Sequence, residues 1–137
     1  TSGQKIKPDV AFALEVGIAG DMPGVKPDQA QEKLGGGPVI LLYDRSMIPN
    51  QGLRDWVIET AEKAEIPFQF DVMEGGGTDA GSIHLVESGV PALVIGVPTR
   101  YIHTHYGILS RRDYELTKKL LTQIILGLDW KMVESFK

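Results

Sequence analysis

An α/β domain built on a mostly parallel sheet is the fold class that this sequence predicts. Short apolar runs rich in β-forming residues alternate along the chain with segments of helical spacing, which is typical of a parallel sheet with helices on both faces. The length of 137 residues and the hydrophobic content of 42% match one globular domain. No internal repeat or linker interrupts the pattern, so we expect one unit.

The first half of the chain is expected to hold two buried strands and a helix. Residues 10–16 and 38–43 are nearly continuous apolar runs, separated by a loop rich in Pro and Gly. Apolar residues between 53 and 64 then recur at helical spacing, and Asn50 precedes them as a candidate N-cap.

The second half repeats the alternation. Residues 67–73 alternate like a strand with one more polar face, and 78–88 are expected to form a short helix that Gly89 stops. A fourth buried strand is expected at 92–97, followed by a brief extended piece at 101–103. The last helix is expected to begin at a cap formed by residues 110–113.

Composition excludes several classes of function. The net charge is −4, from 18 acidic and 14 basic residues, and no basic cluster occurs, so a nucleic-acid partner is not expected. The apolar runs are too short to cross a bilayer and no signal peptide is visible, so no membrane role is expected either. The absence of cysteine excludes thiolate metal sites and fits a cytoplasmic location.

Candidate site residues are sought where ligands of parallel α/β sheets bind, beyond the carboxyl ends of the strands. Glu15 ends the first apolar run, and it is either an acid paired with a base or a helix cap, or a metal ligand. His103 and His105 point to one side if the chain is extended there and could then share a metal. The alternative is one hydrogen-bonded and one exposed histidine, and His84 is expected to be structural or solvated.

The glycine-rich segment 75–81 lies between a strand and a helix and could approach an anion or a substrate closely. It is not a Walker loop, and the alternative is a tight turn capped by Thr78 or Asp79. No nucleophile elbow of a serine hydrolase occurs. A glycosidase with two carboxylates stays open, because the 18 acids offer many pairs.

Three ordered motifs give a more specific indication: residues 13–24 (ALEVGIAGDMPG), 75–81 (GGGTDAG) and 99–105 (TRYIHTH). Together they resemble the dinuclear-metal aminopeptidase family of glutamyl, deblocking and tetrahedral aminopeptidases, often labelled endoglucanase or cellulase M. The likeness extends over essentially the whole chain. It implies a three-layer α/β/α peptidase domain, two divalent metal ions (zinc or cobalt), a peptide substrate and a homo-oligomer.

The resemblance also implies roles for particular residues. Glu15 matches a ligand of one ion and His103 a ligand of the other, while His105 has no metal role and is expected in the pocket. Two such ions activate a water molecule and polarise the scissile carbonyl. The turn with Gly76, Gly77 and Thr78 is expected to line the pocket for the N-terminal residue. Arg100 is expected either to bind an acidic substrate side chain or to form an ion pair within the protein.

Several elements of the family pattern are missing from this sequence. It lacks the N-terminal histidine, the bridging aspartate and the adjacent Glu-Glu pair that supplies the general base, as well as the small inserted domain. Residues 1–137 are therefore expected to be the C-terminal part of the catalytic domain, without a catalytic residue of their own and inactive alone. The missing N-terminal segment is the expected partner. A glycoside hydrolase of the endoglucanase type and a non-catalytic assembly part remain alternatives.

Overall fold

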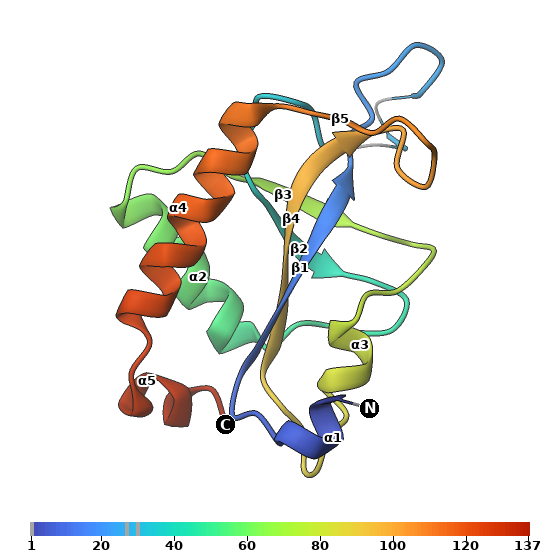
Figure 1. Ribbon diagram of the computed structural model, residues 1–137. Coiled ribbons are helices and arrows are strands. Elements are labelled where there is room, and N and C mark those ends of the chain that lie inside the picture. The colour runs from blue at the N-terminus through green and yellow to red at the C-terminus, as the bar shows by residue number, and fades with distance from the viewer. Residues whose placement is uncertain (1, 27, 30) are drawn as a thin grey trace.

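The centre of the molecule is a twisted five-stranded sheet, seen in a computed structural model that describes residues 2–26, 28–29 and 31–137 (Figure 1). Its strands are β1 (Ala11–Ile18), β2 (Val39–Tyr43), β3 (Gln69–Val72), β4 (Ala92–Arg100) and β5 (Ile108–Leu109). The order is β1-β4-β2-β3, with β5 beside the end of β4. β1 is parallel to β4 and β2 is parallel to β3, so the expected mostly parallel sheet is confirmed.

Helices cover both faces of the sheet (Figure 1). They are α1 (Ser2–Ile6), α2 (Gln51–Lys63), α3 (Ala80–Ile83), α4 (Arg111–Gly127) and α5 (Trp130–Ser135). The larger core lies between the sheet and the helices α2, α4 and α5; its fully buried side chains include Ile40, Leu53, Leu93, Ile95, Leu120 and Ile124. A smaller core lies under α3 on the opposite face. The three layers agree with the α/β/α sandwich that the resemblance implied.

The antiparallel contact between β2 and β4 separates the strands into two pairs of opposite direction. Val39 pairs with Gly96 and Ile40 with Ile95 in this contact. The loops after the strands therefore do not all leave the sheet at one edge. The sequence predicted a mostly parallel sheet but not which strands are antiparallel, because hydrophobic periodicity carries no information about strand direction.

Two expected elements differ from the structure. The expected helix over 78–88 is helical only at α3, Ala80–Ile83, and turns follow it up to Gly89, whose φ is +109°. Residues 101–103 are not extended, since Tyr101 and His103 both have φ of +59°. Short helices α1 and α5 and strand β5 were not expected. The N-caps Asn50 of α2 and Ser110 of α4 are confirmed by hydrogen bonds from Leu53 N and Asp113 N to their side chains.

Candidate functional site

Glu15 lies near the carboxyl end of β1 with its side chain on the α3 side of the sheet. Its Oε1 accepts a hydrogen bond from Asp79 N at 3.4 Å, and the side chain lines a cavity of about 30 Å³ together with Thr78. Glu15 is half-buried and has no salt bridge among the residues that the structure describes. The contact brings two sequence motifs together, because β1 carries Glu15 and the segment 75–81 carries Thr78 and Asp79.

The glycine-rich turn at 75–81 is shaped by packing against Ser46. Gly76 has φ of +91°, which favours glycine. A Cβ at Gly77 would lie 2.9 Å from the Ser46 Oγ, and a Cβ at Gly81 would collide with the same atom. The close packing against Ser46 therefore explains why glycine occupies positions 77 and 81. The backbone of Gly77 is directly followed by Thr78, which lines the cavity.

Asp44 fixes the position of this turn from the end of β2. Its carboxylate is fully buried and accepts hydrogen bonds from Ser46 Oγ at 2.6 Å and from Thr78 Oγ1 at 2.8 Å. Burial by itself would raise the pKa of Asp44, but the hydrogen bonds from Ser46 and Thr78 hold it below its usual value. Asp44 is consequently an ionised anchor that orients the Thr78 hydroxyl.

Two further carboxyl groups line the cavity beside Glu15, and sequence reasoning missed both. Glu32 is 1% exposed. Asp71 of β3 lies beside it, and the two carboxyl groups share a hydrogen bond, which requires that one of them carries a proton. Burial first, and the charge of Asp71 second, raise the pKa of Glu32 to about 8. No motif in the sequence marks either residue, because their meeting depends on long-range folding.

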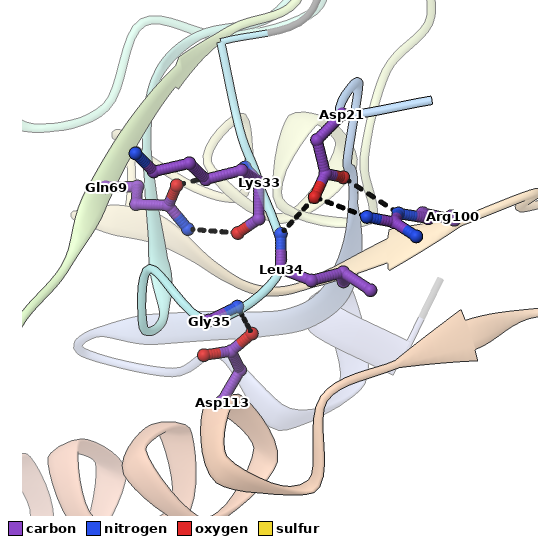
Figure 2. A network of polar contacts seen from close by, with 7 residues as sticks. All are labelled: Asp21, Lys33, Leu34, Gly35, Gln69, Arg100 and Asp113. Atoms are coloured by element: carbon purple, nitrogen blue, oxygen red, sulfur yellow. Dashed lines mark hydrogen bonds and ion pairs between the residues drawn. The ribbon is translucent and has the colours of Figure 1, made fainter. Parts of the chain in front are cut away.

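Arg100, the last residue of β4, is engaged in an ion pair (Figure 2). Its Nη2 and Nε donate to Asp21 at 2.6 and 2.9 Å, and Asp21 also accepts from Leu34 N at 3.3 Å. The Arg100 guanidinium holds the pKa of Asp21 below its usual value. Of the two roles that the sequence left open for Arg100, the structure shows the internal ion pair.

His103 and His105 lie in an exposed loop between β4 and β5. The loop is a tight turn, in which Thr104 Oγ1 donates to Tyr101 O at 2.7 Å and accepts from Tyr106 N at 3.2 Å. The backbone here is therefore not extended, so the condition under which both imidazoles would point to one side is not met. His84 is half-buried at the end of α3, where its Nδ1 lies 3.2 Å from Ala80 O, in keeping with a structural role.

The surface around these residues is hollowed in several places. A hollow of about 350 Å³ adjoins the Glu15 cavity and shares Ile18, Asp71 and Met73 with it. A larger hollow of about 530 Å³ lies around Ala92, at the amino end of β4. A third hollow of about 390 Å³ lies on the α4 side of β1 and is lined by Leu14, Glu15 and Val16. We place the candidate site at the hollow beside Asp71, because it adjoins the cavity in which Glu15 and Thr78 meet.

The side chains of this site can be compared with the ligands that a metal ion requires. Within the described part of the chain, no group of three or more His, Cys, Asp or Glu side chains is arranged to hold a metal. Glu15 comes from strand β1 and His103 from the loop after β4, and each offers one ligand. The residues present therefore do not fit a complete dinuclear centre by themselves.

No helix of the described residues is long and apolar enough to span a membrane.

Comparison with known sequences identifies relatives over most of the chain. Residues 1–120 match the family model of the M42 glutamyl aminopeptidases. The glutamyl aminopeptidase of Lactococcus lactis subsp. cremoris is 35% identical over 136 residues, which are 99% of this chain and 37% of that protein. The lysyl aminopeptidase of Pyrococcus furiosus is 34% identical over 122 residues, 84% of this chain and 34% of that protein.

Solved structures give the same result. The TET aminopeptidase of the archaeon Thaumarchaeota archaeon SCGC AB-539-E09 has a TM-score of 0.97 and 51% identity, over 100% of this chain and 38% of that one. Aminopeptidase APDkam598 of Desulfurococcus kamchatkensis has a TM-score of 0.95 and 38% identity, over 100% and 39%. A structure described as an endoglucanase from Thermotoga maritima has a TM-score of 0.71 and 32% identity, over 99% and 39%.

Proposed function

We propose, from the premise that this chain belongs to the M42 glutamyl aminopeptidase family, that the enzyme containing it removes N-terminal amino acids from peptides. The family match over residues 1–120 carries this proposal, and the contact between Glu15 and the segment 75–81 places two family motifs at one cavity. The chain spans 37% of the length of the Lactococcus lactis relative and 34% of the Pyrococcus furiosus relative. The activity is therefore proposed for a complete enzyme, meaning this chain with the segments that its relatives have in addition.

In that complete enzyme, Glu15 and His103 would each hold one of two divalent ions, zinc or cobalt. The remaining ligands and the general base would come from outside residues 1–137, since the described residues offer no complete metal group. The domain assignment follows: this chain is proposed to be the C-terminal part of the catalytic domain. Bound ions of this kind supply an activated water and polarise a carbonyl group.

The side chains of this chain would bind and orient the substrate. Gly76, Gly77 and Thr78 would form one wall of the pocket, with the Thr78 hydroxyl held by Asp44. His105 would lie at the rim, in the exposed loop that carries His103. The ion pair with Asp21 uses Nε and Nη2 of Arg100. The Nη1 group of Arg100 would face the substrate.

The complete enzyme is also proposed to be a cytoplasmic homo-oligomer. The Pyrococcus horikoshii TET1 peptidase, whose structure has a TM-score of 0.71 and 31% identity to this chain, can assemble into a tetrahedron or a large octahedral shell. The mass of the intact particle in solution tests the assembly, and a monomer at micromolar concentration would contradict it.

Two substitutions in the complete enzyme test the two ligands. We expect His103→Ala to abolish hydrolysis of amino-acid amides and lower metal content, because one ion loses its imidazole. Glu15→Gln should reduce activity with partial recovery in excess metal, and His105→Ala should be milder. Matched controls are His84→Ala and Glu62→Gln, which lie outside the site. Wild-type turnover and two bound metals in His103→Ala would contradict the assignment.

The rival activity, glycoside hydrolysis, has support from the name of the Thermotoga maritima structure. Parallel assays with a peptide amide and a cellodextrin, each with and without a chelator, separate the two. We expect hydrolysis of the peptide only, and its loss with the chelator. Turnover of the cellodextrin would replace the proposal.

A further inference from the structure

The loop between β4 and β5 holds two residues in a backbone conformation that their side chains disfavour. Tyr101 and His103 both have φ of +59°, in the left-handed region where the Cβ atom crowds the neighbouring carbonyl oxygen. For a bulky side chain such as that of Tyr101 this conformation is an outlier. Each of the two residues therefore costs free energy that other contacts must offset.

The ends of helices do not explain these two residues. Among the described residues, Lys7, Glu65 and Glu87 also have φ between +52° and +55°, but they follow the helices α1, α2 and α3, where a left-handed residue commonly ends a helix. Tyr101 and His103 instead lie two positions apart in a loop that joins two strands. Strained backbone of this kind is found most often at functional sites.

Burial does not hold the loop in this shape. Of residues 101–107, only Ile102 is half-buried, and the others are exposed. The base of the loop is fixed, because Arg100 pairs with Ile108 across the two strands and with Asp21 through its side chain (Figure 2). The residues above this base depend on contacts within the loop.

The hydroxyl group of Thr104 supplies such contacts. Its Oγ1 donates to Tyr101 O at 2.7 Å and accepts from Tyr106 N at 3.2 Å. The first bond fixes the peptide group that follows Tyr101, and the second fixes the chain after His103. One hydroxyl therefore joins the two arms of the turn, and His103 lies between the two points that it holds.

We propose that Thr104 is a positioning residue, whose hydroxyl keeps Tyr101 and His103 in the left-handed conformation and so fixes the position of the His103 imidazole. This inference rests on the proposed function, in which His103 is a metal ligand, and adds the residue that presents this ligand. An exposed loop without such a contact would place the imidazole in many positions. A ligand that is already ordered loses less conformational entropy on binding.

Other contacts of the loop do not replace the hydroxyl. The rings of His105 and Tyr106 pack edge to face with centroids 6.4 Å apart, but these residues are neighbours in sequence and do not join the two arms. Valine at position 104 would keep the shape of threonine and offer neither donor nor acceptor, whereas serine would keep both. Because the loop is exposed, water can satisfy Tyr101 O and Tyr106 N when the hydroxyl is absent. Its loss therefore changes the order of the loop more than the stability of the fold.

Three variants of the complete enzyme test this assignment. They are Thr104→Val, Thr104→Ser and the control Thr122→Val, which removes an exposed hydroxyl that donates to Lys118 O on α4. We expect Thr104→Val to lower both zinc affinity and kcat/KM for a peptide amide about tenfold or more, which is the usual effect of removing a group that orients a metal ligand. Thr104→Ser and Thr122→Val should keep wild-type values. Urea unfolding should give the same midpoint for all four proteins.

A purely structural role of Thr104 leads to a different result. In that case the urea midpoint of Thr104→Val falls together with its activity, and this outcome would overturn the proposal. Wild-type zinc affinity in Thr104→Val would overturn it as well. Equal losses in Thr104→Ser and Thr104→Val would show that the hydroxyl is not the group that acts.

A second measurement depends on neither metal nor turnover. The complete enzyme is treated with a chelator, and hydrogen exchange is followed in the peptide that contains residues 101–109. We expect exchange at the Tyr106 amide to be about fivefold or more faster in Thr104→Val than in wild type, and unchanged in Thr104→Ser. Equal exchange in all three proteins would overturn the proposal. An enzyme that neither binds zinc nor hydrolyses amides, but shows this difference, would refute the aminopeptidase function and leave the role of Thr104 in ordering the loop supported.

Discussion

Glu32 governs how stability depends on pH. Its pKa is raised from 4.5 in the unfolded chain to about 8 in the fold, chiefly by burial. Folding therefore takes up a proton between these values. The stabilising contribution is complete below pH 4.5 and is lost as the pH rises through 8, so the free energy of unfolding falls across this window.

Replacing Glu32 by Gln should remove this dependence. Each unit of pKa shift corresponds to about 1.4 kcal/mol, so at pH 9 we expect Glu32→Gln to be more stable than wild type by an amount on the order of a few kcal/mol. Urea unfolding of the 137-residue chain at pH 5, 7 and 9 measures it. Glu62→Gln on the exposed side of α2 is the control. Parallel curves for Glu32→Gln and wild type would contradict the burial effect.

Asp113 is a second buried carboxylate, but one whose partners satisfy it. It is 0% exposed and accepts from Gly35 N at 2.7 Å and Gly37 N at 3.0 Å. Asp113→Ala leaves both amides unpaired, and we expect a loss of about 2–3 kcal/mol in the free energy of unfolding. Asp113→Asn keeps one acceptor and should lose less. Equal stability of Asp113→Ala and wild type would show that water replaces the carboxylate.

At the scale of elements, two helix caps allow a matched comparison. Asn50 Oδ1 accepts from Leu53 N at 2.9 Å, and its Nδ2 donates to Phe136 O at 2.8 Å. Ser110 Oγ accepts from Asp113 N at the longer distance of 3.4 Å. We expect Asn50→Ala to cost about 2 kcal/mol, since it also releases the C-terminus, and Ser110→Ala about 1 kcal/mol or less. Urea unfolding of both variants measures the order, and the reverse order would contradict it.

The same scale shows what the sequence could predict. Helices α2 and α4 could be predicted because their apolar residues recur at helical spacing, and strands β1, β2 and β4 because they are nearly continuous apolar runs. The turn at 101–106 was missed because the side chain of Thr104 closes it on Tyr101, a local contact without a period. Glu32 and Asp71 were missed because segments far apart in sequence bring them together.

Site residues show the same division. Glu15 and the segment 75–81 were selected from motifs, and the structure brings them into contact. Their metal and substrate roles stay predictions. Arg100 was selected for its charge, but its pairing with Asp21 depends on how the loop before β2 folds back. The sequence could therefore identify candidate residues. Whether a candidate is neutralised by an ion pair or exposed to solvent could be seen only in the structure.

At the scale of the whole molecule, two neighbouring strands of the sheet carry the residues of the proposed metal site. β1 carries Glu15, and β4, parallel to it, leads into the loop with His103. The two proposed ligands thus come from neighbouring parts of the sheet, Glu15 from within β1 and His103 from the loop that follows β4. A dinuclear centre needs a bridging carboxylate and several terminal ligands besides.

This arrangement predicts that the 137-residue chain alone binds metal weakly and has no aminopeptidase activity. One ligand per ion leaves most of the coordination shell to water, so a bound ion gains little over the hydrated one. The described residues supply no group of three or more ligands that would change this. Titration calorimetry with zinc should show no sub-micromolar pair of sites, and amide hydrolysis should stay at background. Two tight sites, or measurable turnover, would show that residues 1–137 contain a complete centre. Glu15→Gln and His103→Ala in the same titration would then identify whether these two ligands belong to it.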